Sequence, residues 1–169
     1  MSAPEPEIRI CQPLREGELY GFYKRNNICE EGYGKELSEV VLKHEGVWVA
    51  VYDKGELIGF ARALYDGVTG EIVEINLDLR YQSENDFRNG CFIESDPYGI
   101  AKNMAIALLK ELRRRGCYFF STVIFEEFAE REFYASLGFC ENTGHKNYTI
   151  DARPYVPGGD ERGGRIDAC

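Results

Sequence analysis

The stretch YGIAKNMAIALLKELRRRGC, residues 98–117, predicts a glycine-led amphipathic helix around which the rest of the chain is organised. Its apolar residues recur at intervals of three and four, as in a helix with one buried face; they are Ala101, Met104, Ala105, Leu108, Leu109 and Leu112. Arginines at 113–115 and Gly116 mark its end. Gly99 has no Cβ, so a ligand can approach the unpaired backbone N–H groups of the first turn. Such a helix start favours a bound anion, above all a phosphate.

Length and charge indicate one acidic domain. The chain has 169 residues, 44% of them hydrophobic, which is enough for one well-packed core. We expect residues 1–153 to form that domain and residues 154–169, which have glycines and charges but no period, to be a flexible tail. The formal net charge of −9 argues against a sequence-independent nucleic-acid binder. It indicates an acidic soluble surface or the attraction of a cationic substrate.

The cysteines and the N-terminus bear on the cellular compartment. Cysteines at positions 11, 29, 91, 117, 140 and 169 form no CxxC pair, which is typical of reduced thiols. With only His44 and His145 in addition, no zinc site is expected, and His44 is expected to pack at the end of a helical apolar stripe. The start MSAPEPEIRI lacks a signal-peptide pattern, and no apolar run reaches the roughly eighteen residues of a membrane span. We therefore expect a cytoplasmic protein without a membrane partner.

On the N-terminal side of the glycine-led helix, the patterns predict strands and two modest helices. A short strand is expected at residues 8–11, helices at 15–26 and 34–44, and a hairpin of strands 47–52 and 57–64. In the next strand, residues 71–79, apolar Val73, Ile75, Leu77 and Leu79 alternate with polar Glu74, Asn76 and Asp78. The polar face must meet water or line a cleft. Residues 81–95 are expected to form an inserted loop or small hairpin.

On the C-terminal side, a strand is expected at residues 118–123 and a helix at 126–137, closed by Gly138. Ala129, Phe133 and Leu137 form the expected buried stripe of this helix. A last pair of strands is expected at residues 139–141 and 147–150.

This order of elements and two motifs resemble the GNAT superfamily of acetyl-CoA-dependent N-acetyltransferases. Gly99-Ile100-Ala101 is similar to the Gly-x-Gly/Ala of that family, and FYASLGF, residues 133–139, is similar to its Phe-Tyr-x-x-x-Gly-Phe signature. The Arg/Gln position before the glycine fits Gln82 by order and Asp96 by spacing, because an insertion lies between them. The resemblance implies an α/β (α+β) GNAT fold. Its central sheet would be mixed, mostly antiparallel and twisted, with about six to seven strands, about four flanking helices and an insertion before the third helix.

The resemblance also implies acetyl-CoA as cosubstrate and no metal. Backbone N–H groups of the first helical turn would hold the diphosphate, with Lys102 adding a charge, and the free edge of the strand at residues 76–78 would hold the pantetheine arm. The expected cofactor-binding residues are Asn76, Leu77, Asp78, Gln82, Gly99, Ile100, Ala101, Lys102 and Asn103.

The resemblance implies catalytic roles for two side chains. Tyr134 is the candidate general acid for the departing thiolate, because a phenol with a pKa of about 10 stays protonated at neutral pH; its alternative is a core tyrosine. Glu74 is the candidate base, acting directly or through a water, and its alternative is an exposed carboxylate or an ion pair with a neighbouring arginine. Asp78 and Glu126 are weaker candidates.

The resulting hypothesis is an N-acetyltransferase that moves an acetyl group from acetyl-CoA to a primary amine by direct attack. A small cationic acceptor is favoured by the acids expected to flank the cleft, Glu30, Glu31, Glu84 and Asp86. A protein or peptide amine is an alternative. The rival from another class is a catalytically silent GNAT-like module that binds acyl-CoA as a sensor or interaction surface. No nucleic-acid partner is expected, and a homodimer remains open.

Overall fold

The computed structural model describes residues 5–28, 35, 38, 40–44, 46–82, 90–124 and 128–144. The chain divides into two compact units, Met1–Phe139 and Cys140–Cys169. Of the second unit only residues 140–144 are described, and they form neither helix nor strand. Every element below belongs to the first unit. The expected domain limit at residue 153 lies outside the described residues.

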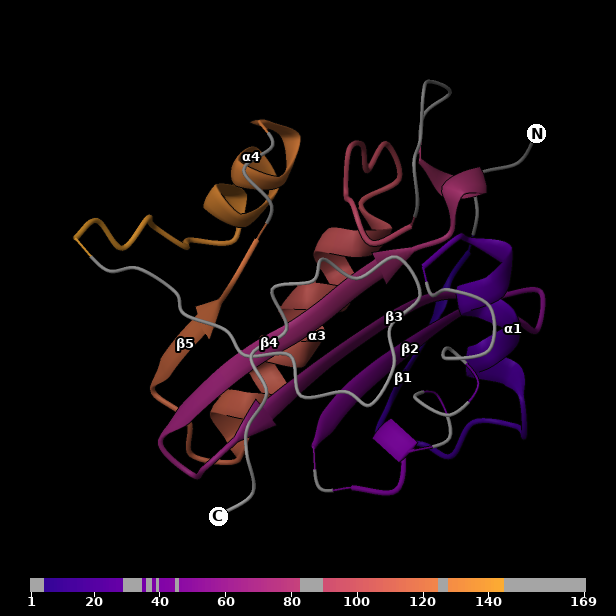
Figure 1. Ribbon diagram of the computed structural model, residues 1–169, viewed down its shortest axis with the longest axis horizontal. Helices are drawn as coiled ribbons and strands as arrows, with labels where there is room; N and C mark the ends of the chain where they lie inside the picture. The colour runs from indigo at the N-terminus through magenta and orange to yellow at the C-terminus, as the bar shows by residue number, and fades with distance from the viewer. Residues whose placement is uncertain are drawn as a thin grey trace, which may run out of the picture. The chain divides into compact units, whose positions relative to one another are not determined.

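A mixed sheet forms the centre of the first unit (Figure 1). In the described residues it has five strands in the order β1-β2-β3-β4-β5. Their bounds are β1 Glu7–Ile10, β2 Val47–Asp53, β3 Glu56–Tyr65, β4 Thr69–Leu77 and β5 Phe119–Thr122. The first four strands pair antiparallel, and β5 runs parallel to β4. Because parallel neighbours need a crossover, a helix has to connect β4 to β5, and the helix of residues 98–117 does so.

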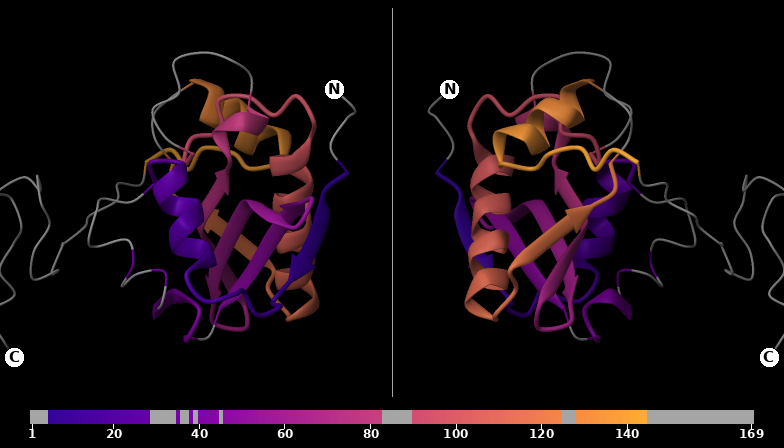
Figure 2. Two further views of the ribbon diagram at one scale, coloured as in Figure 1. Left: turned by 90° about the vertical axis from the view of Figure 1, so that its right-hand side faces the viewer. Right: turned by 90° about the vertical axis from the view of Figure 1, so that its left-hand side faces the viewer.

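That helix, α3 (Ile100–Arg114), and α1 (Glu18–Arg25) cover opposite faces of the sheet (Figure 2). Strand β2 shows why both faces are buried: Val47, Val49 and Val51 belong to the core on the α3 side, whereas Ala50 and Tyr52 belong to the core on the α1 side. Alternate residues of a strand point to opposite faces. The α3-side core is closed by fully buried residues of the helix itself, namely Ile100, Ala101, Met104, Ala105, Leu108 and Leu112. The predicted apolar face of the helix is therefore confirmed, except that Leu109 is only partly buried.

The predicted mixed α/β architecture is confirmed, but the numbers of strands and helices with described bounds differ from the prediction. Three α-helices have described bounds, α1, α3 and α4 (Phe128–Ser136), and a short 3-10 turn, η1, spans Leu79–Tyr81. Of the predicted helix at 34–44, residues 34, 36, 37 and 39 lie outside the described part, whereas residues 35, 38, 40 and 41 are helical as predicted; His44 is exposed rather than packed. The predicted strand at 139–141 is wrong, because its backbone joins no ladder. The ring of Phe139 packs instead on Tyr134, with ring centroids 5.7 Å apart, and residues 147–150 lie outside the described part.

The hairpin of β2 and β3 is confirmed, and its turn explains its register. Lys54 and Gly55 both have positive φ, +50° and +78°. A two-residue turn with two such residues is of type I′, whose twist matches that of the flanking strands. Glycine at the second position avoids the steric cost that a Cβ brings in this region.

Replacing Gly55 by alanine should lower the free energy of unfolding by about 1–2 kcal/mol, the cost of a Cβ in the left-handed region. No atom lies within 4 Å of the added Cβ, so the backbone alone is tested. Gly21→Ala in α1, which likewise meets nothing within 4 Å, is the control and should stabilise by up to about 1 kcal/mol. Urea unfolding of both variants checks this; equal shifts in the same direction would contradict it.

Strand β4 carries a bulge. Ile72 and Glu74 pair with consecutive residues of β3, so Val73 is an extra residue in the ladder. A bulge reverses the side to which the following residues point. Ile72, Ile75 and Leu77 therefore share the α3-side core, whereas Val73 is 44% exposed. The predicted alternation holds from Glu74 to Leu77 and is wrong at Val73 and at Leu79, which lies in η1 beyond the end of the strand.

Candidate active site

A fork between β4 and β5 defines the candidate site. The two strands pair only along four residues of each, ending at Ile72 and Thr122. At the last pair, the Thr122 hydroxyl donates to the Ile72 carbonyl oxygen at 3.1 Å. Beyond it, no strand in the described residues pairs with this side of β4. A strand that loses its neighbour presents backbone N–H and C=O groups to whatever fills the gap.

The direction of these groups follows from two hydrogen bonds at the end of β4. The Asp78 N–H points toward β3 and donates to the Ile58 oxygen at 2.8 Å, whereas the Leu77 N–H points to the open side. Because N–H groups alternate between the two edges of a strand, Ile75 also turns its N–H to the open side. Sequence reasoning placed the relevant edge at residues 76–78 and did not single out Ile75. Only the register with β3 decides which residues of β4 turn their N–H groups to the open side.

Tyr134 lies at this fork. It is buried on α4, 7% exposed, and its ring packs on Phe133 with centroids 5.3 Å apart. Its hydroxyl lies close to the Thr122 side chain, beside the point where β4 and β5 part. Burial, and then the charge of Glu130, raise the pKa of Tyr134 to about 12. The phenol therefore stays protonated throughout the neutral range.

Glu130 is a site residue that the predicted stripe of α4 missed. Ala129 was expected on the buried face, but Glu130 is the buried residue there, 4% exposed, one helical turn before Tyr134. Its Oε1 accepts a hydrogen bond from the Ile93 N–H at 3.1 Å. Burial raises the pKa of the Glu130 carboxyl, and the Ile93 N–H partly offsets this. The spacing of four residues from Tyr134 was the available signal; the burial depends on residues 90–95, which no local pattern places.

Glu74 lies on the other face of the sheet and is held by three donors. Its carboxylate accepts hydrogen bonds from the Tyr23 hydroxyl at 2.7 Å, the Asn76 amide at 2.6 Å and the Arg62 Nε at 2.9 Å. The ion pair with Arg62 is the structural alternative that the sequence left open. Tyr23 belongs to the α1-side core and Tyr134 to the α3-side core. The two candidate catalytic residues therefore face opposite sides of the sheet.

Tyr23→Phe should lower the free energy of unfolding by about 1.5 kcal/mol, the lower end of the range for a hydrogen bond to a charged group. The lower end applies because Glu74 keeps two donors and is 17% exposed. Tyr20→Phe is the control, since the structure records no hydrogen bond of its hydroxyl among the described residues. Guanidinium unfolding of the two variants gives the comparison, and an equal loss in both would show that the Tyr23 bond adds nothing.

Asp78 is fully engaged in a buried cluster. Its carboxylate, 0% exposed, accepts bonds from Arg25 Nε at 3.0 Å, Arg80 Nε at 2.9 Å and Asn26 Nδ2 at 3.3 Å. Burial opposes the charged form, but the bonds from Arg80 and Arg25 outweigh it and hold the pKa of Asp78 below its ordinary value. This cluster ties the end of β4 to α1, so in this conformation the Asp78 side chain serves the scaffold.

The start of α3 is already hydrogen-bonded. Gly99 stands at the N-cap with φ of +68°, and the Asn103 N–H donates to its carbonyl oxygen. The N–H groups of Ala101 and Lys102 donate to the Asp96 carboxylate at 3.2 and 2.9 Å. Asp96 reaches them because its carbonyl oxygen accepts the Gly99 N–H in a tight turn. The amides expected to hold a phosphate thus have a carboxylate of the chain itself as acceptor.

The backbone of Leu77 is bonded as well. Its N–H donates to the Gly90 oxygen at 3.1 Å, and its carbonyl oxygen accepts from Gln82 Nε2 at 3.1 Å. The Gln82 Oε1 in turn accepts the Glu94 N–H. The structure therefore brings the expected residues of β4, Gln82 and the start of α3 to one region, joined by residues 90–96.

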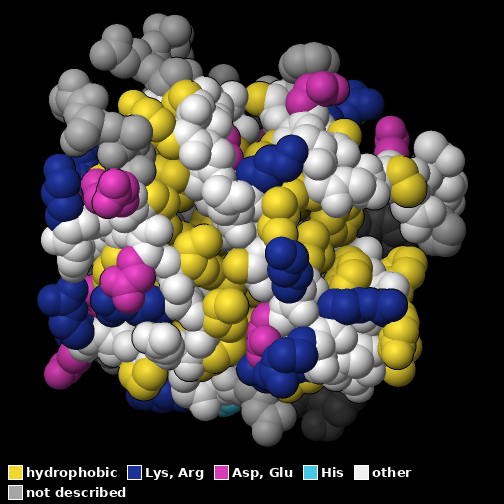
Figure 3. Space-filling view, turned by 180° about the vertical axis from the view of Figure 1, so that it is seen from behind, with side chains coloured by type: hydrophobic (Ala, Val, Ile, Leu, Met, Phe, Trp, Pro, Cys, Tyr) yellow, Lys and Arg dark blue, Asp and Glu magenta, His cyan; other side chains and the backbone are white. Residues whose placement is uncertain are grey.

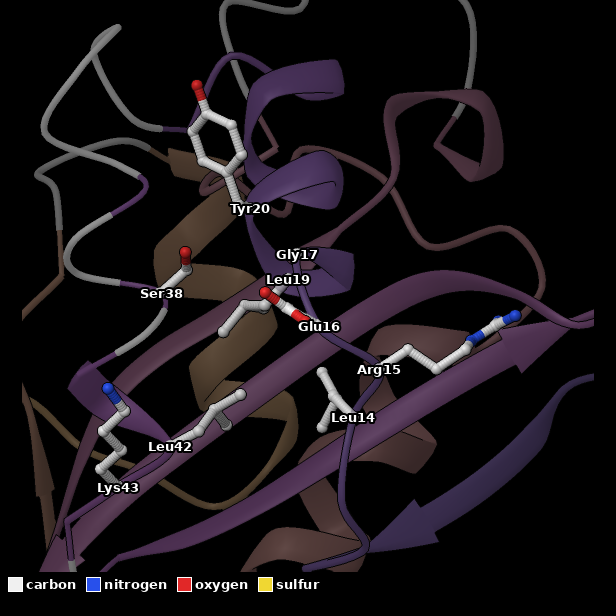
Figure 4. A pocket seen from close by; sticks show the side chains of 9 residues that line it. All are labelled: Leu14, Arg15, Glu16, Gly17, Leu19, Tyr20, Ser38, Leu42 and Lys43. Atoms are coloured by element: carbon white, nitrogen blue, oxygen red, sulfur yellow. The ribbon is translucent and has the colours of Figure 1, made fainter.

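A separate open pocket of about 330 Å³ lies between the start of α1 and residues 38–43 (Figure 4). Apolar and charged side chains of both signs line it, among them Leu14, Arg15, Glu16, Leu19, Leu42 and Lys43. None of the expected site residues is among its lining residues, so it is distinct from the fork.

In the part of the chain that the structure describes, no group of three His, Cys, Asp or Glu residues comes together as a metal site requires, and no helix is long and apolar enough to cross a membrane.

No family model matches the sequence, and no curated protein matches it either. The structure, in contrast, is similar to solved acetyltransferases. A probable acetyltransferase from Staphylococcus aureus shares 17% identity with a TM-score of 0.63, over 86% of this chain and 99% of that one. A GNAT-family acetyltransferase from Streptococcus pneumoniae shares 17% with a TM-score of 0.62, over 86% and 100%. An aminoglycoside N-acetyltransferase in complex with CoA shares 17% with a TM-score of 0.62, over 88% and 96%. The fold is that of GNAT-family acetyltransferases, as the sequence predicted.

Proposed function

We propose that the protein is an acetyltransferase that uses acetyl-CoA and moves the acetyl group to a primary amine by direct attack. The single observation that carries this proposal is the place of the Tyr134 hydroxyl. It is buried, protonated and close to Thr122 where β4 and β5 part. Transfer from a thioester needs a donor at the departing sulfur and a backbone N–H at the carbonyl, and we propose that Tyr134 and the Ile75 N–H supply them.

The cofactor is proposed to lie along the open side of β4, with its diphosphate at the start of α3. Lys102, which is exposed in the first turn of α3, supports an anionic ligand at this end of the helix; Lys110, Arg113 and Arg114 are exposed farther along, where Arg114 pairs with Glu111. Lys and Arg side chains lie across the middle of the face seen from behind (Figure 3). The chain as a whole has a net charge of −9. The local positive charge therefore favours binding of a polyanion at α3 rather than elsewhere on the surface.

The chemistry follows from the two faces of the sheet. The Ile75 N–H, on the open side of β4, is proposed as the donor to the developing oxyanion. Tyr134 donates a hydrogen bond to the departing thiolate; full transfer of its proton is opposed by the Glu130 charge, which disfavours a phenolate nearby. The acceptor amine approaches from the α1 side, where Glu74 lies. Because Glu74 already accepts three hydrogen bonds, we propose that it takes the amine proton through a water.

A small cationic amine is the proposed acceptor. The similarity to an aminoglycoside N-acetyltransferase supports this class, as does the Glu74 carboxylate on the acceptor side. The flanking acids named from the sequence lie outside the described residues. A protein or peptide amine is the alternative acceptor.

A second candidate function is the catalytically silent module that binds acyl-CoA. One observation favours it: Asp96 and Gly90 hold amides that a cofactor would need. Calorimetric titration with acetyl-CoA, followed by thiol release with aminoglycosides, polyamines and a peptide amine, separates the two functions. Turnover with an amine supports the enzyme, binding without turnover supports the silent module, and absence of binding contradicts both.

A further inference from the structure

Residues 90–96 cross the region between the end of β4 and the start of α3. Four hydrogen bonds of their backbone connect these residues to four different elements or turns. The Gly90 oxygen accepts the Leu77 N–H at 3.1 Å, and the Gly90 N–H donates to the Asn26 oxygen at 2.8 Å. The N–H groups of Ile93 and Glu94 donate to Glu130 and Gln82, both at 3.1 Å. The segment is therefore docked along its length.

The segment is also packed, most tightly at its first residue. Ile93 is 2% exposed and belongs to the α3-side core. A Cβ added to Gly90 would lie 2.8 Å from the Leu77 carbonyl oxygen and 3.1 Å from the Asn26 Cβ. A backbone oxygen cannot move aside cheaply, so only glycine lets the segment approach β4 this closely.

At its other end the segment supplies an anion. The Asp96 carboxylate accepts the N–H groups of Ala101 and Lys102, one bond to each oxygen. A carboxylate on the first-turn amides of a helix occupies the place, and matches the charge, of a bound phosphate group. At the same site it also repels a second anion.

Together these contacts give the segment the two attachments that acetyl-CoA would use. A carbonyl oxygen sits on the β4 amide of Leu77, and an anion sits on the amides of α3. We propose that residues 90–96 are an intramolecular competitor of acetyl-CoA, which must leave the Leu77 edge and the α3 amides before the cofactor binds. This inference rests on the proposed function and adds a regulatory contact to its site. The Ile75 edge is not bonded by the segment, so the competitor covers the cofactor arm and diphosphate rather than the thioester.

The consequence is a reduced apparent affinity. The observed dissociation constant rises in inverse proportion to the fraction of molecules with the segment released. Weakening either attachment should therefore tighten acetyl-CoA binding. Asp96→Asn removes the charge and keeps the shape, and Gly90→Ala introduces the contact at 2.8 Å with the Leu77 oxygen. We expect Asp96→Asn to bind acetyl-CoA about tenfold more tightly than the wild type, the change that follows from the loss of one charge-assisted hydrogen bond. Gly90→Ala should also bind it more tightly, because the added Cβ disrupts the attachment at Leu77.

Two matched controls separate this effect from a general change. Gly21→Ala is the same substitution at a glycine with nothing within 4 Å. Asp66→Asn alters another carboxylate that accepts backbone N–H groups, those of Val68 and Thr69, in the β3–β4 turn. The Gly116 end of α3 packs by that turn, so Asp66 lies about one helix length, roughly 20 Å, from the α3 start. Both controls should bind acetyl-CoA as the wild type does.

The experiment is calorimetric titration of the five proteins with acetyl-CoA, with amide hydrogen exchange of the free and bound wild type. We expect exchange at Ile93 and Glu94 to rise on binding, because the segment leaves its partners. Equal affinity of all five proteins with unchanged protection at these amides would overturn the competitor and leave the proposed function standing. Weaker binding by Asp96→Asn, a variant of a surface carboxylate that leaves the core intact, would also overturn it. Failure of every protein to bind would overturn the cofactor itself and the competitor with it.

Discussion

Tyr134→Phe should lower kcat for acetyl transfer by about 10²- to 10³-fold, the usual loss when one hydrogen-bond donor to developing charge is removed, and leave the affinity for acetyl-CoA within about twofold. The phenyl ring keeps the packing on Phe133 and Phe139, with centroids 5.3 and 5.7 Å away. Only the hydroxyl beside Thr122 is lost. Steady-state thiol release and calorimetric titration of the same protein separate turnover from binding.

Tyr52→Phe is the matched control for this variant. The pKa of Tyr52 is also raised to about 12, first by burial and then by Glu18, whose carboxylate its hydroxyl meets at 2.8 Å. Tyr52 lies in the α1-side core near the hairpin turn, away from the fork. It should lose stability but keep kcat within a few-fold. Equal losses of kcat in both variants, or none in Tyr134→Phe, would remove Tyr134 from the proposed chemistry.

The raised pKa of Tyr134 fixes the sign of its pH dependence. With a pKa of about 12, the hydroxyl keeps its proton at neutral and moderately alkaline pH. No fall of kcat between pH 7 and 10 should therefore come from Tyr134. The folded pKa lies above the unfolded value of about 10, so the neutral phenol contributes its full stability below pH 10, and this contribution is lost as the pH rises through 12.

Asp78→Asn should lower the free energy of unfolding by about 3 kcal/mol, the low end of the range for breaking a buried ion pair. The low end applies because Arg25 and Arg80 are 35% and 52% exposed and can turn to water, although the carboxylate itself is fully buried. The loss should appear as a lower midpoint in urea unfolding at an unchanged slope.

Glu56→Gln tests the same arginines from the solvent side. Glu56 pairs with Arg80 at 2.9 Å and with Arg25 at 3.4 Å but is 46% exposed, so its loss should cost less than about 1 kcal/mol.

The pKa of Asp78 is lowered in the folded state, so its contribution to stability is full above the unfolded pKa of about 3.9 and is lost as the pH falls through the folded pKa. The difference between wild type and Asp78→Asn should therefore be constant from pH 5 to 8 and shrink in acid. A difference that persists in acid would show that packing, not charge, causes the loss.

The fold could be predicted because its helices and turns follow from patterns of residues that are close together in the sequence. The stretch of residues 98–117 carries the helical period, and Gly99 and Gly116, with φ of +68° and +100°, stand where the helix begins and ends. The Lys54-Gly55 turn fixes the hairpin of β2 and β3 by its own conformation. Each of these features depends on side chains only a few residues apart, so one sequence is enough to find it.

The candidate site could be predicted only in outline. FYASLGF located Tyr134, and the glycine motif located the start of α3. The parity of β4, however, depends on a bulge against β3, and the burial of Glu130 depends on Ile93, 37 residues away. Neither of these long-range contacts can be predicted from the periodicity of a short segment.

By itself, then, the sequence determined the helices and strands of the fold up to α4, although not the segment that follows it, and the family whose motifs they resemble. Only the tertiary structure decided what each polar group meets: Glu74 meets Tyr23 and Arg62, and the α3 amides meet Asp96. The physical reason is that periodicity is set by the spacing of neighbouring side chains along the chain. The partner of a buried charge or an open amide is set instead by which distant segment satisfies it when the chain packs.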